Sequence, residues 1–215
     1  MASKAEIGHA SKIFSVLKKE YPAVKSALNY SNPFQLLIAT ILSAQCTEER
    51  VNIVTQTLFK KYRKAQDFVN TESGEIEKDI YSTGFYRQKA KSIKQCCRAL
   101  LDKHKGKVPA DFGELNKLPG VGRKTASVVA GNAFGIPAVA VDTHVKRLSN
   151  LMGFIDSSDS NKIEFKLKEL LLEKEWVSSS HLLAAHGRKI CTARRPKCLR
   201  CPVGNYCPSF NPAND

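Results

Sequence analysis

Residues 118–145 read LPGVGRKTASVVAGNAFGIPAVAVDTHV, and this stretch decides the fold. Gly120 and Gly122 lie in a turn directly before an expected helix that carries Lys124 in its first turn. Glycine lets a backbone turn tightly and come close to a ligand, and the amides at a helix N-terminus bind anions. The stretch therefore predicts a helix-hairpin-helix motif that holds a phosphate. A plain turn between two helices is the alternative.

Lys124 stands near the N-terminal end of its helix, where the positive end of the helix dipole disfavours a cation. The same field, together with the charge of Arg123, is expected to lower the pKa of the amine. A neutral amine is the form that attacks a sugar carbon and forms a Schiff base. The residue types alone also allow a simpler role, in which charged Lys124 contacts a phosphate.

Asp142 ends an apolar run that follows the helix breakers Gly135 and Pro137. We expect a helix over residues 139–152, with Asp142 as the cap near its sheltered N-terminal end. A carboxylate in such a place stabilises a positively charged, oxocarbenium-like sugar. A purely structural helix cap is the alternative.

Apolar residues outside this stretch recur at helical spacing, and no segment shows the sustained alternation of a strand. Ser31 or Asn32 is expected to cap a nearly all-apolar, buried helix, and Thr47 to cap the next one. The sequence therefore predicts an all-α fold. Further helices are expected over residues 6–20, 34–44, 47–62, 64–82 (as two short helices), 87–104, 111–117, 161–173 and 175–190.

The composition narrows the class of protein. The chain has 215 residues, 42% of them hydrophobic, which suits one large domain or two small ones with a buried core. Its formal net charge of +14 suggests a polyanion partner, most often nucleic acid, although a merely soluble basic protein also has such a charge. No apolar run reaches the roughly 18–20 residues of a membrane helix. Residues 1–14, MASKAEIGHASKIF, lack the apolar core of a signal peptide, so we expect a cytoplasmic protein.

Two junctions between expected helices carry side chains suited to nucleic acid. Gln45 follows the buried apolar helix and either points into a cleft or caps a helix end. Phe85 and Tyr86 follow Gly84 beside several basic residues, and an apolar side chain there can wedge between bases. Packing of both aromatic rings into the core is the alternative.

Seven cysteines in a cytoplasmic chain argue against a disulfide framework. Four of them lie within 17 residues. Structural zinc sites usually have two close cysteine pairs, and only one is present here, so the spacing favours an iron–sulfur cluster over structural zinc, which stays the alternative. Arg194, Arg195 and Lys197 lie in the first loop of this group and are placed to reach phosphate. The four clustered cysteines are Cys191, Cys198, Cys201 and Cys207. The remaining three, Cys46, Cys96 and Cys97, are expected to be ordinary buried residues.

Four motifs, LPGVGRKTA, VDTHVKR, LLIATILSAQCT and C-x6-C-x2-C-x5-C, together resemble endonuclease III. That family comprises DNA glycosylase/AP lyases of base-excision repair within the helix-hairpin-helix glycosylase superfamily. The match runs in order from about residue 30 to Cys207. The resemblance implies an all-α, two-domain fold. A six-helix barrel domain is implied for residues 26–136, and a domain that binds a [4Fe-4S] cluster for residues 1–25 and 137–215.

The resemblance also implies roles for single residues. Lys124 is implied as the nucleophile at C1′ of the damaged nucleotide, and Asp142 as the carboxylate that assists base departure and lysine activation. Gln45 is implied to fill the gap left by a flipped base, and Phe85 to act as a wedge where many relatives have leucine. The cluster ligands are implied to be Cys191, Cys198, Cys201 and Cys207. DNA contacts are implied at Gln45, Phe85, Leu118, Gly120, Val121, Gly122, Thr143, His144, Arg194 and Lys197.

Such an enzyme flips an oxidised pyrimidine, such as thymine glycol, out of double-stranded DNA and nicks the resulting abasic site by β-elimination. We expect a nucleoid-associated monomer without a membrane partner. Related adenine-mismatch and thymine-mismatch glycosylases commonly lack a lysine at the position of Lys124, so this residue favours a bifunctional lyase. Two readings come from other classes: a non-catalytic DNA-binding module, and a redox sensor built on the cluster.

Overall fold

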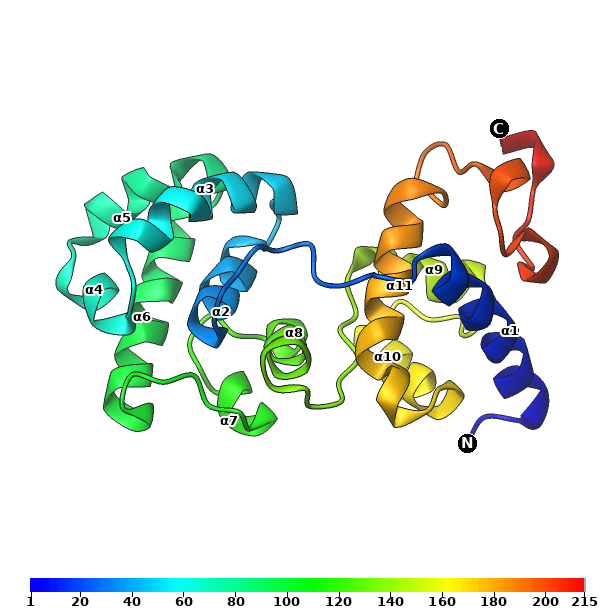
Figure 1. Cartoon of the computed structure of the whole chain (residues 1–215), viewed down its shortest axis with the longest axis horizontal. Helices are drawn as coiled ribbons and strands as arrows, with labels where there is room; N and C mark the ends of the chain where they lie inside the picture. The colour runs from blue at the N-terminus through cyan, green and yellow to red at the C-terminus, as the bar shows by residue number, and fades with distance from the viewer. Residues whose placement is uncertain (215) are drawn as a thin grey trace. The chain divides into compact units, whose positions relative to one another are not determined.

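The computed structural model describes residues 1–214, and within this range the chain forms helices and no strand. The prediction of an all-α fold is therefore confirmed. Figure 1 shows the two compact units into which the chain divides. One consists of Ser26–Ile136, and the other joins Met1–Lys25 to Pro137–Asp215. In the part of the chain that the structure describes, no helix is long and apolar enough to cross a membrane.

The unit of residues 26–136 is built around α2, which contacts α3, α6 and α8. The Asn32 side chain caps α2 by accepting a hydrogen bond from the backbone N–H of Gln35 at 3.0 Å. Pro33 takes the first helical position, where its missing N–H breaks no hydrogen bond. The helices of this unit are α2 (Pro33–Leu42), α3 (Glu48–Lys61), α4 (Ala65–Asn70), α5 (Ser73–Ile80), the 3-10 turn η1 (Tyr81–Thr83), α6 (Tyr86–His104), α7 (Phe112–Asn116) and α8 (Arg123–Phe134).

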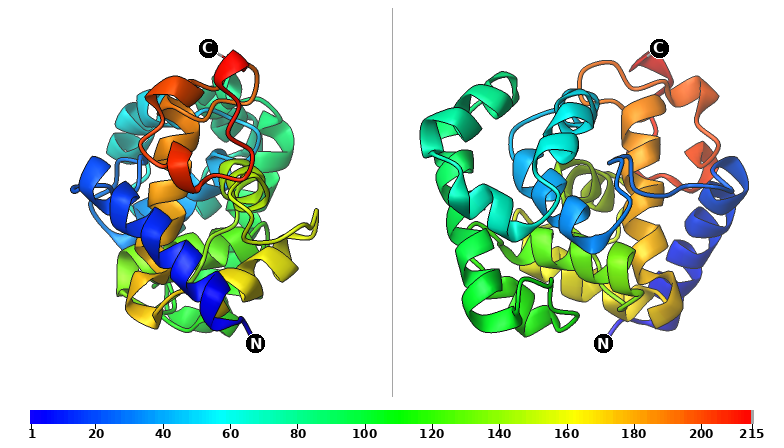
Figure 2. Two further views of the ribbon diagram at one scale, coloured as in Figure 1. Left: turned by 90° about the vertical axis from the view of Figure 1, so that its right-hand side faces the viewer. Right: turned by 60° about the vertical axis from the view of Figure 1, so that its left-hand side comes forward.

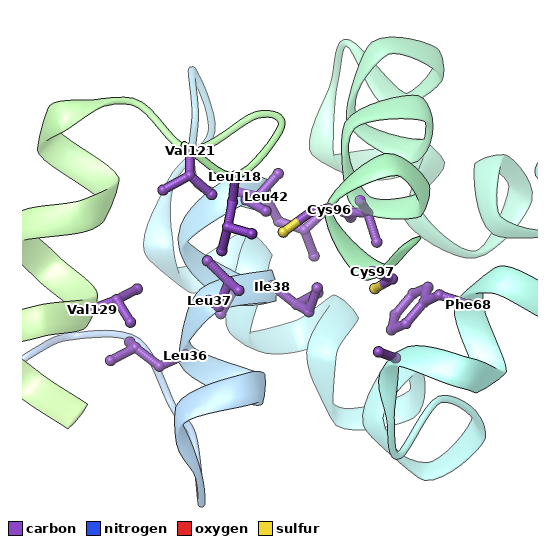
Figure 3. Close-up of a cluster of buried hydrophobic side chains, with 14 of the residues drawn as sticks. Leu36, Leu37, Ile38, Leu42, Phe68, Cys96, Cys97, Leu118, Val121 and Val129 are labelled. Carbon is purple, nitrogen blue, oxygen red and sulfur yellow. The ribbon is translucent and has the colours of Figure 1, made fainter. Parts of the chain in front are cut away.

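The core of this unit surrounds the apolar α2, whose residues from Leu36 to Leu42 are all buried. Figure 3 shows side chains from α2, α4, α6 and α8 meeting in this core, together with Leu118 and Val121 from the turn before α8. Full burial of one such side chain stabilises the fold by roughly 1.5–3 kcal/mol. The turn before α8 is thus anchored to the most buried helix of its unit.

The second unit gathers both ends of the chain. Ser3 and Glu6 form a capping box at the start of α1, and Ala10, Ile13 and Leu17 bury its apolar face. Figure 2 shows α1 (blue) beside the segment that follows α11 (orange to red), where α1 contacts η4. The elements of this unit are α1 (Lys4–Glu20), α9 (Thr143–Leu151), α10 (Ser160–Leu170), η2 (Glu173–Glu175), α11 (Trp176–Lys189), η3 (Cys198–Arg200), η4 (Gly204–Tyr206) and η5 (Pro212–Asn214).

The expected helix over residues 139–152 is wrong at its start, because α9 begins only at Thr143. Residues 136–142 are not helical. Pro137 lacks an N–H, and the N–H of Ala140 donates to Ser180 Oγ at 2.9 Å instead of to a helical carbonyl. The apolar run is therefore a buried connecting segment that leads directly to Asp142.

Candidate functional site

The turn between α7 and α8 is a tight backbone hairpin. Gly120 has a φ of +75°, and a Cβ atom at this position would lie 2.7 Å from Ser92 Cβ on α6. Only glycine fits this conformation and this approach together. Leu118 and Val121 are only 4% and 5% exposed, so their side chains hold the hairpin in the core. Leu118 and Val121 can therefore contact a ligand only through their backbone atoms.

The N-terminus of α8 opens from this hairpin. Gly122 is its N-cap and supplies no side-chain acceptor, so the first N–H groups of α8 have no partner within the helix. The Arg123 guanidinium lies over the Phe112 ring at 5.5 Å and adds positive charge. Free amides, a helix dipole and a cation together form a site for an anion such as a phosphodiester.

Lys124 occupies the second position of α8 and is exposed. Its Nζ has no hydrogen-bond or ion-pair partner among residues 1–214. The amine is thus held beside the anion site and is free to react or to bind. Lys124 belongs to the unit of residues 26–136, as do Gln45, Phe85 and the hairpin.

Asp142 is the N-cap of α9, as expected from the sequence. Its Oδ1 accepts a hydrogen bond from the N–H of Val145 at 2.7 Å, and the residue is half-buried. No described residue donates to Oδ2, so this oxygen is available to a ligand. Thr143 beside it is exposed and His144 is half-buried. These three residues share the second unit with the cysteine cluster.

Gln45 and Phe85 share an unusual backbone conformation. Their φ angles are +51° and +48°, a left-handed region that residues with a side chain rarely adopt. Phe85 is 65% exposed, and the described part of the chain shows no capping hydrogen bond from the Gln45 amide. Core packing is therefore excluded for Phe85, whereas Tyr86 does pack against the core. Strained, exposed side chains of this kind are typical of functional positions.

A buried lysine supports the turn that presents Phe85. Lys89 is 5% exposed, and its Nζ donates to the backbone oxygen of Thr83 at 2.8 Å. Burial lowers the pKa of Lys89, partly offset by nearby Cys46. Lys89 is one of the basic residues beside Phe85 and Tyr86 that the sequence suggested for contact with nucleic acid, and its burial shows that this expectation is wrong for Lys89.

The four clustered cysteines line one cavity of about 90 Å³. Burial raises the pKa of the Cys201 thiol to about 11 and also raises the pKa values of Cys191 and Cys207. Across residues 1–214, no three His, Cys, Asp or Glu side chains converge on a point that suits a single metal ion. Four thiols around a cavity wider than one ion fit a multi-iron cluster better than zinc.

The loop between Cys191 and Cys198 presents Arg194 and Lys197 to solvent. Among the remaining cysteines, Cys96 and Cys97 are buried as expected, and burial raises the pKa of Cys96 to about 12. Cys46 is only partly buried, so the expectation of an ordinary buried residue is wrong for it. It lies in the solvent-facing junction that also carries Gln45.

Two residues that sequence reasoning missed contact the clustered cysteines. Arg147 Nη1 donates to the backbone oxygen of Cys191 at 2.6 Å and lies 3.6 Å from its Sγ, and Arg147 Nη2 lies 3.5 Å from His144 Nδ1. His186 Nε2 lies 3.5 Å from Cys201 Sγ. Burial, together with the charge of Arg147, lowers the pKa of His186 to about 4. The only hint in the sequence is the position of His186 five residues before Cys191.

Comparison with known proteins finds two family models that match separate stretches of the chain. Residues 38–173 match the HhH-GPD superfamily of base excision DNA repair proteins. Residues 191–207, which begin and end at a clustered cysteine, match the iron–sulfur binding domain of endonuclease III. The chain therefore carries an iron–sulfur cluster site, of the [4Fe-4S] type in this family.

Individual relatives cover nearly the whole chain. Endonuclease III of Synechocystis is 48% identical over 97% of this chain and 95% of its own length. A solved non-covalent complex of an endonuclease III with DNA is 43% identical, covers 98% of this chain and 97% of its own, and superposes with a TM-score of 0.93. A trapped covalent endonuclease III–DNA intermediate gives the same identity and TM-score, and each chain covers 98% of the other. On these grounds the chain belongs to the endonuclease III family of base excision repair DNA glycosylases, within the HhH-GPD superfamily.

Proposed function

We propose that this protein is a bifunctional DNA glycosylase and AP lyase that removes oxidised pyrimidines from double-stranded DNA. One observation carries the proposal. In a chain of this family, a free lysine amine stands in the first turn of the helix that follows the glycine hairpin. A pure DNA-binding module has no need of a reactive amine beside its phosphate site.

In this proposal the unit of residues 26–136 is the helix-hairpin-helix domain, and the other unit is the iron–sulfur domain. The amides after Gly120 and Gly122 hold a phosphate of the damaged strand, which fixes the register of the enzyme on DNA. The exposed ring of Phe85 wedges into the duplex, and Gln45 fills the gap left by the flipped nucleotide. Thr143, His144, Arg194 and Lys197 add contacts to DNA from the iron–sulfur domain.

Lys124 is the proposed nucleophile. The lone pair of Nζ forms a bond to C1′ as the glycosidic bond between C1′ and the base nitrogen breaks, and the departing base takes up a proton that the amine gives up. The sugar ring opens to a Schiff base between C1′ and Nζ. Loss of a proton from C2′ then expels the 3′ phosphate by β-elimination and nicks the strand. The carboxylate of Asp142 stabilises the positive charge that develops on the sugar.

Cys191, Cys198, Cys201 and Cys207 are the proposed ligands of the [4Fe-4S] cluster. The donor set fits, because four thiols line one cavity. The loop that carries them is polar, and binding of the cluster would supply the free energy that holds it in place. When bound, the cluster supplies structural cross-linking of residues 191–207, and the glycosidic chemistry does not pass through it. The cross-link holds Arg194 and Lys197 in a defined loop.

The proposed partner is DNA that contains a damaged pyrimidine or an abasic site. A DNA-repair enzyme works where the chromosome is, so we place the protein at the nucleoid in the cytoplasm. The proposed enzyme acts as a monomer, because a single chain supplies the hairpin, the lysine and the carboxylate. Analytical ultracentrifugation of the protein with and without a short duplex tests this last point.

Borohydride trapping tests the proposal directly. Wild type and Lys124→Gln are incubated with a duplex that carries one thymine glycol, and borohydride is added. Wild-type protein is expected to give a covalent protein–DNA adduct, and Lys124→Gln to give none while it still binds the duplex. Lack of an adduct with folded wild-type protein that contains iron would contradict the lyase mechanism. Release of base without strand nicking would then identify a monofunctional glycosylase.

A further inference from the structure

His186 is an entirely buried histidine that has no part in the proposed glycosidic chemistry. It lies on α11 and is 0% exposed. Its two ring nitrogens face two segments that are far apart in the sequence: Nδ1 lies 3.1 Å from Tyr21 Oη, at the end of α1, and Nε2 lies 3.5 Å from Cys201 Sγ. The Tyr21 and His186 rings meet edge to face at a centroid distance of 6.0 Å.

The direction of both hydrogen bonds follows from the chemistry of a metal-bound cysteine. A thiolate that ligates iron has no proton, so its sulfur can only accept a hydrogen bond. Nε2 must therefore carry the N–H that points to Cys201. The opposite nitrogen, Nδ1, then has a lone pair and accepts the O–H of Tyr21. Burial raises the pKa of Tyr21 to about 12, so this O–H is present at neutral pH.

We infer that His186 is a positioning residue for the iron–sulfur cluster, donating an N–H···S hydrogen bond to Cys201 in a tautomer that Tyr21 fixes. This inference rests on the proposed function only in taking Cys201 as a cluster ligand. A hydrogen bond to a ligand sulfur stabilises the more electron-rich state of a cluster and so raises its reduction potential. The interaction moves no proton, and the electron in the measurement below comes from an electrode.

A pair of substitutions separates hydrogen bonding from packing. His186→Met fills a similar volume but has no donor, whereas the side-chain amide of His186→Gln can place an N–H near the position of Nε2. The measurement is the midpoint potential of the full-length, iron-loaded protein without DNA, with iron per chain determined on the same samples.

His186→Met is expected to lower the midpoint potential, with a tenfold change in the one-electron equilibrium constant, or about 59 mV. His186→Gln is expected to keep most of the wild-type potential. Tyr21→Phe removes the O–H that holds Nδ1 as an acceptor and so weakens the preference for this tautomer, which should give an intermediate shift. His186→Met is also expected to lose iron faster than His186→Gln when a chelator is added.

Equal potentials in wild type and His186→Met, at equal iron content, would overturn the inference. Equal shifts in the Met and Gln variants would overturn it as well, because they would show an effect of packing alone. If His186→Met does not fold, an unchanged potential in Tyr21→Phe serves the same purpose. A separate variant tests the proposed cofactor site: if Cys201→Ser binds as much iron as wild type, Cys201 is not a ligand, and the failure then lies in the ligand assignment on which the inference rests.

Discussion

At the scale of single residues, the left-handed conformation of Phe85 marks a side chain kept for a purpose other than stability. We predict that Phe85→Gly raises the free energy of unfolding by up to about 1.5 kcal/mol and lowers DNA glycosylase turnover. The left-handed penalty of about 1–2 kcal/mol disappears, while glycine adds about 0.5–1 kcal/mol of chain entropy to the unfolded state. Denaturant unfolding and single-turnover base release measure the two effects.

The same helix supplies the control. Lys105 caps the C-terminus of α6 with a φ of +54°, so Lys105→Gly removes a comparable strain at the opposite end of the helix. This variant should gain stability without any change in turnover. Equal losses of turnover in the two variants would show that Phe85 has no special role.

A second prediction at this scale concerns the two roles of Asp142 as helix cap and as charge. Asparagine caps a helix about as well as aspartate, so Asp142→Asn should keep the free energy of unfolding within about 0.5 kcal/mol of wild type. Loss of the carboxylate charge should lower the rate of base release by about 10²–10³-fold. Asp159 caps α10 in the same way, with Oδ1 accepting from Asn161 N–H at 2.7 Å, so Asp159→Asn is the matched control. A similar rate loss in both variants would contradict the proposed role.

At the scale of elements, a glycine with positive φ lies on each side of α8: Gly120 shortly before its start and Gly135 directly after its end. Gly120 meets Ser92 closely, whereas Gly135 has a φ of +67° and open space around its Cβ position. We predict that Gly135→Ala destabilises the protein by about 1–2 kcal/mol through strain alone. Gly120→Ala should cost about 2–4 kcal/mol, because overlap with α6 adds to the strain. Urea unfolding measures the difference, and equal losses would show that the hairpin does not depend on close contact with α6.

How much of these elements the sequence could predict depends on whether the deciding interaction is local. Asn32 and Thr47 were recognisable as caps because an N-cap bonds to the backbone three residues later. The non-helical conformation of segment 137–142 was not recognisable from the sequence. Its apolar pattern suits a helix, whereas its backbone N–H at Ala140 donates to Ser180, forty residues away. The contacts of Arg147 and His186 with the clustered cysteines could not be predicted for the same reason, because their partners lie in other segments. The strain at Gln45 likewise has no counterpart in the residue type.

At the scale of the whole molecule, the net charge of +14 predicts strong dependence of DNA binding on salt. Each phosphate contact lowers the slope of log K against log[salt] by about 0.9. Replacing both Arg194 and Lys197 by glutamine should therefore make the slope shallower by about 2. The control replaces exposed Lys12 and Lys19 of α1, which removes the same charge outside the proposed interface. Fluorescence anisotropy at several salt concentrations measures the two slopes. Equal slopes for the two double variants would exclude the loop between Cys191 and Cys198 from the DNA interface.

The division of one unit between the two ends of the chain has a consequence for biosynthesis. The helix α1 leaves the ribosome before the other described helices. About 150 residues separate its end at Glu20 from the end of α10 at Leu170, and α10 helps to cover it. At about 5–20 residues per second, the apolar face of α1 stays uncovered for roughly 8–30 s. During this time the middle unit can fold, while Ile13, Phe14 and Leu17 remain available to chaperones or to other nascent chains. Among the described helices, α1 is thus made first and its apolar face is open to aggregation for this time.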